Sequence, residues 1–267
     1  MCARASAAGA DAVKYNERMK ETLYGRNAVY EALRAHRREM FGLQVAEGAN
    51  PSGRLAESIE LAQKLRIPVS NVPRARLDRL DANHQGVALE AGEYRYADVT
   101  DILDQSSARS ELPFILILDS LQDPQNFGTL LRTAEAVGVH GVVIPLARAV
   151  GVTPAVVNAS SGATEHLCIA QSNLAQTIEA LKDSDVWIVG LDQDGEPISA
   201  ASERHLHGSV GLVVGSEGEG LHHLTKQKCD VLLRLPMRGQ VESLNAAVAG
   251  SVALYLAYMA RGEMAAG

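Results

Sequence analysis

The sequence predicts an α/β protein with a parallel sheet covered by helices in its C-terminal part and a smaller α/β unit ahead of it. Five apolar runs in the C-terminal part are typical of strands buried on both faces: FILIL, GVVIP, VWIVGL, VGLVVG and VLLRLP. Helical segments separate these runs, and strands that alternate with helices form parallel sheets. The 267 residues, 46% hydrophobic and 21% charged, suit one or two globular domains.

The N-terminal third alternates helical and strand patterns. We predict helices over residues 27–35, 52–65 and 73–80, and strands over residues 43–46, 68–71 and 86–91. The next stretch contains the polar, serine-rich DQSSARSEL without sustained apolar periodicity. We therefore predict a loose tail over residues 1–20, a small domain over 21–95, a linker over 96–112 and a larger domain over 113–267.

The formal net charge of −7 is distributed unevenly along the chain. Residues 1–79 carry a net charge of +5, and residues 80–267 carry −12. This asymmetry favours a polyanionic partner for the N-terminal third, and the alternative is a chance distribution that serves solubility. The candidate phosphate contacts are Arg34, Arg37, Arg38, Arg74 and Arg76.

Several classes of protein are disfavoured by the sequence. No run approaches the roughly 20 uninterrupted apolar residues of a membrane-spanning helix. The three cysteines, Cys2, Cys168 and Cys229, are far apart and lack zinc-site spacing. His222 and His223 are adjacent, so on a helix they point about 100° apart rather than toward one metal. We expect a cytoplasmic protein without a metal site.

Three loop segments follow predicted strands, at the sheet edge where open parallel sheets bind ligands. The first, DSLQDPQNFGTLLRTAEAVG, places Asn126 at a helix N-cap and Arg132 further along the helix. The near neighbours of Arg132 are apolar, and a charge beside a buried face favours an anionic partner. An ordinary ion pair and an anionic ligand both remain open at this point.

The second segment, GSEGEG at residues 215–220, directly follows the apolar run VGLVV. Glycines there could let backbone amides hold a phosphate, but the dinucleotide pattern GxGxxG is absent. Glu217 would also repel a pyrophosphate. A ligand that is cationic or offers hydroxyl donors fits better, and the alternative is a tight turn whose glutamate faces water.

The third segment, LPMRGQVESLNAAVAG at residues 235–250, leads from a strand end into a long Ala-rich helix that we predict from Ser243 to about Ala260. Ser243 is the predicted N-cap. Asn245 is a poor helix former with no evident structural need at an early helical position, which makes a ligand contact possible.

Together, NFGTLLR, GSEGEG and LPMRGQVESLN resemble the three signature motifs of the SpoU ribose methyltransferases, within the SPOUT superfamily. The resemblance covers about residues 114–260. YGRNAVYEAL and the HQG at residues 84–86 resemble the small ribosomal-protein-like substrate-binding domain of the same enzymes. One departure is the pair Ala246 and Ala247, where the family commonly has Val-Ser.

This resemblance implies S-adenosylmethionine-dependent 2'-O-methylation of a ribose in RNA, and the favoured substrate is a guanosine of 23S ribosomal RNA. It also implies a deep trefoil knot in the methyltransferase domain, RNA binding by residues 21–95, and a homodimer formed by the knotted domain. Neither a DNA nor a membrane partner is expected. The methyl donor would lie against Gly215, Leu235 and Leu244, and the catalytic and RNA-facing set would be Asn126, Arg132, Glu217, Ser243 and Asn245.

The family proposal gives Arg132 the role of base, after its contact with an RNA phosphate. A guanidinium has a pKa above about 12 and resists deprotonation. Stabilising the developing alkoxide and holding the phosphate is therefore physically easier. Alternative functions are a transfer RNA or antibiotic-resistance ribosomal RNA methyltransferase, and a non-catalytic RNA-binding ribosome-assembly factor. The presence of all the polar motif residues counts against the last of these.

Overall fold

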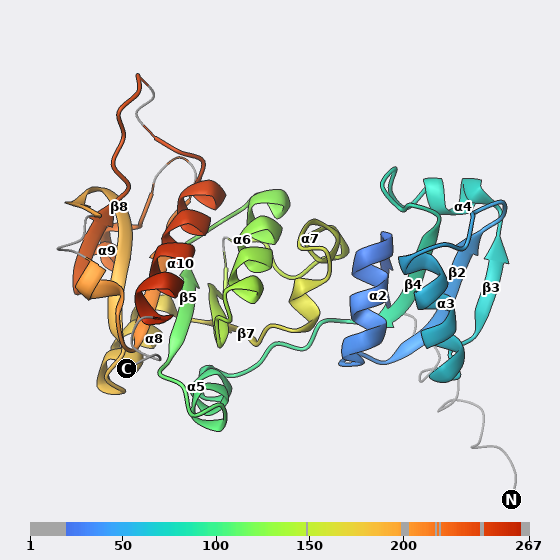
Figure 1. Cartoon of the computed structure of the whole chain (residues 1–267), viewed down its shortest axis with the longest axis horizontal. Coiled ribbons are helices and arrows are strands. Elements are labelled where there is room, and N and C mark those ends of the chain that lie inside the picture. The colour runs from blue at the N-terminus through green and yellow to red at the C-terminus, as the bar shows by residue number, and fades with distance from the viewer. Residues whose placement is uncertain are drawn as a thin grey trace, which may run out of the picture. The chain divides into compact units, whose positions relative to one another are not determined.

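The computed structural model describes residues 20–147, 149–198, 203–216, 218, 220–240 and 243–262. The chain forms two compact units, Met1–Arg95 and Tyr96–Gly267, each with its own sheet and helices (Figure 1). The predicted α/β class is confirmed in both units.

The first unit is a four-stranded sheet in the order β1-β4-β2-β3 with helices packed on it. β4 runs antiparallel to β1 and β2, whereas β2 and β3 are parallel. Its elements are β1 Lys20–Tyr24, α2 Arg26–Ala35, β2 Met40–Ala46, α3 Arg54–Lys64, β3 Val69–Val72, α4 Arg74–Asp78 and β4 Val87–Gly92. All six predicted elements are confirmed. β1 was missed because only its last two residues are buried, so its apolar pattern is short.

Arg38 corrects the predicted set of phosphate contacts. Its side chain is buried, donates to Glu21 Oε2 at 2.6 Å, and lies 5.0 Å from the ring centroid of Tyr94. A buried arginine that already has a carboxylate partner holds the sheet to the end of α2 and does not face a polyanion. The charge count alone could not separate this arginine from its exposed neighbours.

The second unit contains a six-stranded sheet in the order β10-β8-β9-β5-β6-β7, and every pair of neighbours is parallel. Its strands are β5 Phe114–Leu118, β6 Gly141–Pro145, β7 Ile169–Ser172, β8 Trp187–Pro197, β9 Val210–Val214 and β10 Val231–Arg234. The five apolar runs are all strands, so the predicted parallel sheet is confirmed. β7 was missed because its sequence, IAQS, has only two buried residues.

Helices cover both faces of this sheet. The helices are α5 Val99–Ala108, α6 Pro124–Ala136, α7 Pro154–Ala159, α8 Leu174–Asp183, α9 His223–Lys228 and α10 Ala246–Gly262, with short 3₁₀ turns at Ala163–Glu165 and Glu203–Leu206. Ile115 and Ile117 of β5 share a core with Ile102 of α5 and Ile178 of α8. On the other face α10 packs on α6 so closely that a Cβ at Gly250 would lie 2.6 Å from Leu130.

The predicted linker, residues 96–112, contains the helix α5, which packs against the sheet. A capping box of Asp98 and Asp101 starts this helix, and Ile102 lies against Gly141, where an added Cβ would be 2.5 Å away. Only Ile102 and Ser106 are buried on α5, so its sequence shows no sustained apolar period. Polarity alone therefore suggested a linker where the structure has a packed helix.

A buried histidine fixes the start of β5 after this helix. His140 Nδ1 accepts from the backbone N–H of Phe114 at 3.0 Å, and its Nε2 donates to Glu111 at 2.9 Å. Burial lowers the pKa of His140, which favours the neutral ring that this pair of bonds requires. These bonds join the start of β5 to the residue directly before β6.

Two implications of the family resemblance concern topology and assembly. The trefoil knot and the homodimer stay predictions, because strand order does not specify how a chain is threaded or which surfaces associate. Among the described residues, no helix is long and apolar enough to span a membrane.

Candidate functional site

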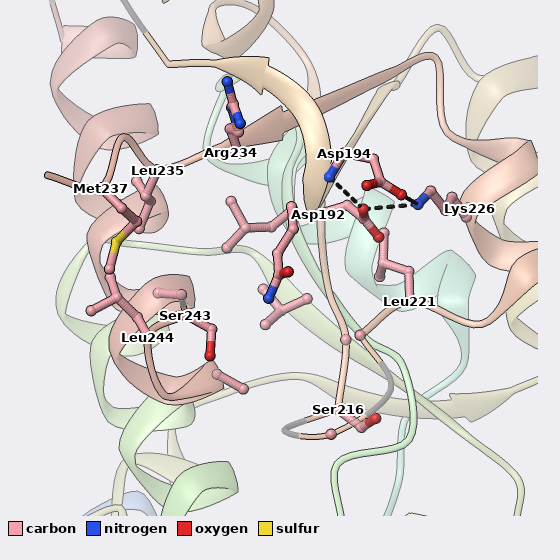
Figure 2. Close-up of a pocket in the computed structure, with 18 of the residues that line it drawn as sticks. Asp192, Asp194, Ser216, Leu221, Lys226, Arg234, Leu235, Met237, Ser243 and Leu244 are labelled. Atoms are coloured by element: carbon pink, nitrogen blue, oxygen red, sulfur yellow. Dashed lines mark hydrogen bonds and ion pairs between the residues drawn. The ribbon is translucent and has the colours of Figure 1, made fainter. Parts of the chain in front are cut away.

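A cavity of about 770 Å³ lies at the carboxyl ends of β8, β9 and β10. The three residues predicted to contact a methyl donor, Gly215, Leu235 and Leu244, all line it, and so does Ser243. Figure 2 shows Leu235, Ser243 and Leu244 along one wall, with Ser216 below and Asp192 and Lys226 on the opposite wall. Segments far apart in the sequence thus converge on one cavity, as the strand ends predicted.

The loop after β9 folds back on itself at the floor of the cavity. Ser216 N–H donates to Gly220 O at 3.0 Å, and Gly220 N–H donates to Ser216 O at 3.2 Å. This turn lies directly against Gly215, where an added Cβ would be 2.2 Å from the Gly220 carbonyl carbon. Glycine is therefore required at 215 by close backbone approach rather than by a special torsion. The predicted catalytic residue Glu217 lies outside the described residues.

A buried aspartate joins this loop to the end of β5. Asp119, directly after β5, accepts from the backbone N–H of His222 at 2.8 Å, and its other carboxylate oxygen lies 3.0 Å from the His222 ring Nδ1. The ends of β5 and β9 are thereby held together at the edge that carries the cavity. His222 has this structural role, and no group of three or more His, Cys, Asp or Glu among the described residues could hold a metal.

One wall of the cavity is an extension of β8 that leaves the sheet. β10 pairs with β8 at Val189 and Gly190 and again at Glu196 and Pro197, so residues 191–195 have no partner in β10. Asp192, Gln193 and Asp194 in this extension line the cavity. The sequence VWIVGL predicted the strand but gave no sign that its continuation, DQDGEP, would form a wall.

An ion-pair network stands on this wall. Lys226 Nζ donates to Asp192 at 2.8 Å and to Asp194 at 2.7 Å, and the Asp192 side chain is only 10% exposed. The hydrogen bond to Asp192, followed by that to Asp194, raises the pKa of Lys226, and the bond from Lys226 lowers the pKa of Asp194. The sequence analysis missed all three residues, because lone charges after a strand resemble an ordinary solvated turn.

Asn126 and Asn245, from the first and third segments, meet beside the cavity. Asn245 Nδ2 donates to Asn126 Oδ1 at 3.1 Å. The predicted N-cap at Asn126 is wrong, because Asp123 caps α6 by accepting from the backbone N–H groups of Gln125 and Asn126. Asp123 caps the helix, and the Asn126 side chain instead accepts the hydrogen bond from Asn245.

The cap of α10 also differs from the prediction. The helix begins at Ala246, and Asn245 Oδ1 accepts from the backbone N–H groups of Ala247 at 2.9 Å and Val248 at 3.2 Å. Asn245 is therefore the N-cap, and Ser243 lies two residues before it on the cavity wall. Asn245 does have a structural need to be there, and its amide nitrogen also reaches the first segment.

Arg132 lies on the exposed side of α6, outside the cavity lining. Its Nη1 donates to the Ser161 hydroxyl at 3.2 Å. No carboxylate among the described residues lies within ion-pair distance of it, so the ordinary ion pair considered above is not seen in that part of the chain. Ser161 was missed because a serine in a polar turn carries no pattern of its own.

Comparison with known proteins decides the family. The SpoU rRNA Methylase family matches residues 113–255, and an RNA 2'-O ribose methyltransferase substrate-binding domain matches residues 22–97. The chain belongs to the SpoU rRNA methylase family. This confirms the family resemblance drawn from the three motifs, and it makes the chain an RNA methyltransferase of the TrmH/SpoU type.

Relatives match along nearly the whole SpoU chain. A Bacillus subtilis protein named for the TrmH family of tRNA/rRNA methyltransferases is 44% identical over 89% of this chain and 94% of its own length. A Staphylococcus saprophyticus protein with the same family name is 41% identical over 90% and 95%, respectively.

Solved structures share the fold. The SpoU methyltransferase AviRb from Streptomyces viridochromogenes, in complex with AdoMet, has a TM-score of 0.74 at 22% identity and covers 95% of this chain and 94% of its own. An AdoMet-bound rRNA methyltransferase from Sinorhizobium meliloti has a TM-score of 0.71 at 22% identity, covering 91% and 88%. A tRNA-modifying TrmH/SpoU enzyme of A. aeolicus has a TM-score of 0.51 at 24% identity and covers 58% of this chain and 78% of its own.

Proposed function

We propose that this SpoU enzyme transfers the methyl group of S-adenosylmethionine to a ribose 2'-hydroxyl, with a guanosine of 23S ribosomal RNA as its target. The observation that carries the proposal is the cavity that the second and third motif segments form with the extension of β8. The first segment is joined beside it by the hydrogen bond between Asn245 and Asn126. The cavity volume of about 770 Å³ lies within the range of sites for cofactors and other small molecules, about 300–1,000 Å³.

The chemistry of the cavity fits the donor. S-adenosylmethionine carries a sulfonium cation, an ammonium group and ribose hydroxyls, and the wall with Asp192 and Asp194 offers carboxylate oxygens to such groups. The opposite wall, with Leu235 and Leu244, is apolar and suits the adenine ring. We infer that Gly215, Leu235 and Leu244 hold the donor. When bound, the donor supplies the electrophilic methyl group.

The other motif residues serve the acceptor. Displacement at the methyl carbon requires the ribose oxygen to be held in line with the leaving sulfur, so positioning is a large part of catalysis. Arg132 would hold an RNA phosphate and stabilise the developing alkoxide, while Asn126, Asn245, Ser243 and Glu217 orient the ribose and Arg132. Arg132 fits this role because its exposed charge is bonded to a neutral hydroxyl.

The two functions of Asn245 can be separated by Asn245→Asp. A carboxylate accepts from the backbone N–H groups at the start of α10 as well as an amide does, and its charge favours a helix N-terminus. It cannot donate to Asn126. We therefore expect thermal stability to stay within about 1 kcal/mol of wild type, while single-turnover methyl transfer falls at least about tenfold. A rate equal to that of wild type would show that Asn245 is only a cap.

RNA binding by the first unit is proposed for a cleft of about 460 Å³ lined by Arg26, Arg74 and loop residues 48–50 and 85–86. The loop with residues 85–86 is held by the buried His84. His84 Nδ1 accepts from the Gly86 N–H at 2.9 Å, and its Nε2 donates to Asp78 at 2.9 Å. The lining contains two arginines and no carboxylate, so it suits a phosphate backbone.

Neutralising the cleft should weaken RNA binding in a salt-dependent way. Each lost phosphate contact removes about 0.7–0.9 from the slope of log affinity against log salt. The double variant Arg26→Gln, Arg74→Gln should therefore bind RNA more weakly, with a slope shallower by about 1.5 in fluorescence anisotropy titrations. Lys64→Gln with Arg66→Gln removes the same charge from two exposed residues at the end of α3 that do not line the cleft, and it is the control. Equal slopes for the two double variants would place the RNA elsewhere.

The homodimer is proposed for one face of α10. Val248, Val252, Tyr255 and Met259 are spaced by three or four residues, so they form one stripe along the helix, and they are 48%, 41%, 49% and 58% exposed. An apolar stripe of this kind on a soluble enzyme marks an interface. A second copy is the occupant we propose, because the family resemblance implies a dimer of this domain.

Charge on this stripe should separate the two copies. We expect wild-type enzyme to have twice the 28.5 kDa chain mass by light scattering, and Val252→Glu to have the mass of one chain. Gln176→Glu, on the exposed side of α8, adds the same charge outside the stripe and should remain dimeric. A monomeric wild-type protein at micromolar concentration would contradict the proposed dimer.

The ribosomal target is supported by the extent of the structural matches. The rRNA methyltransferase of S. meliloti covers 91% of the chain, including the substrate-binding unit, whereas the A. aeolicus tRNA-modifying enzyme covers 58%. Ribose methylation should therefore be mapped in total RNA from cells with and without this protein. Loss of one methylated guanosine in 23S ribosomal RNA is the expected result, and loss of a transfer RNA methylation would favour the alternative.

A further inference from the structure

We propose that Ser161 is a positioning residue that holds the Arg132 guanidinium in its working orientation. The inference rests on the proposed function, because it assumes that Arg132 acts on the RNA. Its basis is a hydrogen bond, a left-handed backbone conformation and a close helix contact, all within the second unit.

The hydrogen bond from Arg132 to Ser161 orients the guanidinium without neutralising its charge. Arg132 Nη1 donates to the Ser161 hydroxyl at 3.2 Å. An exposed arginine otherwise samples many rotamers, and fixing one nitrogen limits them. A hydroxyl is a neutral acceptor, whereas a carboxylate in its place would neutralise the guanidinium. The remaining N–H donors of Arg132 stay available for a phosphate or a ribose oxygen.

Ser161 occupies a backbone position that favours glycine. The end of α7 has Ser161 N–H bonded to Asn158 O at 2.9 Å and Gly162 N–H bonded to Val157 O at 2.8 Å. These are the two bonds of a Schellman motif, in which the residue at position 161 has left-handed torsions, here with φ 55°. Glycine is the usual residue there because a Cβ is unfavourable. Serine at this position is therefore less stable than glycine would be, so replacing Ser161 with glycine should not destabilise the turn.

A close contact between α6 and α7 sets the distance between the two residues. Gly128 lies one turn before Arg132 on α6, and a Cβ at Gly128 would be 2.5 Å from the Ala159 Cβ and 2.8 Å from the Ser160 nitrogen. Only glycine lets the end of α7 approach so closely. The turn with Ser161 therefore lies rigidly beside the part of α6 that carries Arg132.

The test is Ser161→Gly, for which stability and activity should change in opposite directions. Glycine relieves the left-handed torsion, so the melting temperature should stay equal or rise. Loss of the hydroxyl should lower the single-turnover methyl transfer rate about tenfold to a hundredfold, with unchanged affinity for S-adenosylmethionine. Loss of a merely structural residue would not give an enzyme with an equal or higher melting temperature and a lower methyl transfer rate. That combination therefore identifies a positioning role.

The chain supplies a matched control in Ser110. It also has φ 55°, and it closes the same motif at the end of α5, with Ser110 N–H bonded to Ser107 O and Glu111 N–H to Ser106 O, both at 3.0 Å. Ser110→Gly should change stability as Ser161→Gly does and leave the methyl transfer rate unchanged. Ser161→Asn tolerates left-handed torsions and offers an amide oxygen, so it should restore part of the rate.

The outcomes separate this inference from the function on which it rests. If Arg132→Ala is inactive and Ser161→Gly reacts at the wild-type rate, the positioning role is overturned and the proposed function stands. If Arg132→Ala itself remains active, the proposed role of Arg132 is contradicted, and the inference on Ser161 falls with it. A slow Ser161→Gly enzyme with wild-type donor affinity and a partly active Ser161→Asn enzyme would support the proposal.

Discussion

Replacing Arg132 with alanine should reduce methyl transfer at least about a hundredfold, the usual effect of removing a donor that stabilises developing negative charge. Donor affinity should hardly change, because Arg132 does not line the cavity. Stability should also be nearly unchanged, since the side chain is exposed and its described contact is one hydrogen bond to Ser161. Single-turnover assays with saturating RNA and donor measure the first effect, and calorimetry measures the second.

Arg132→Lys sharpens this expectation. Lysine keeps the charge but presents one compact ammonium group in place of a planar fork, so it cannot hold a phosphate and a second oxygen in fixed directions. We expect it to be nearly as inactive as the alanine variant. Arg109→Ala is the control, because Arg109 is exposed on the same unit, directly after α5, and its side chain donates to Gln105 Oε1 at 3.4 Å. Wild-type activity in Arg132→Ala would remove Arg132 from the mechanism.

The strands of the methyltransferase domain could be predicted because burial on both faces leaves an unbroken apolar run. β5, with the sequence FILIL, is buried at every position, and the strand ends then placed the three loop segments at one edge. β7 and α5 could not be predicted in the same way. Each contributes few buried residues, and the packing of Ile102 on Gly141 joins residues far apart in the sequence.

The site residues show a similar division. Gly215, Leu235 and Leu244 were placed by their motifs, and the structure brings them to one cavity. The caps were harder, because both Asp123 and Asn126 suit a helix N-terminus and only the backbone decides which residue starts the helix. Asp192 was missed because its role depends on where β8 leaves the sheet. That departure follows from pairing with β10, a strand about forty residues later.

Gly215→Ala should weaken binding of S-adenosylmethionine, because the added methyl group would lie 2.2 Å from the Gly220 carbonyl carbon and 2.5 Å from the Leu221 nitrogen. Both are backbone atoms, so the clash cannot be relieved by rotating a side chain. The turn that closes between Ser216 and Gly220 must move away from the floor of the cavity. Displacements of this kind cost about 1–3 kcal/mol.

If that cost falls on donor binding, the dissociation constant should rise by about 5- to 150-fold. Isothermal calorimetry of the full chain with S-adenosylmethionine measures it, and circular dichroism verifies that the variant is folded. Gly262→Ala is the matched control, since an added Cβ there meets nothing within 4 Å at the end of α10. Unchanged affinity in Gly215→Ala, together with unchanged thermal stability, would show that the loop after β9 does not form the floor of the donor site. A large loss in Gly215→Ala alone would place the donor against that loop, where the parallel strands end.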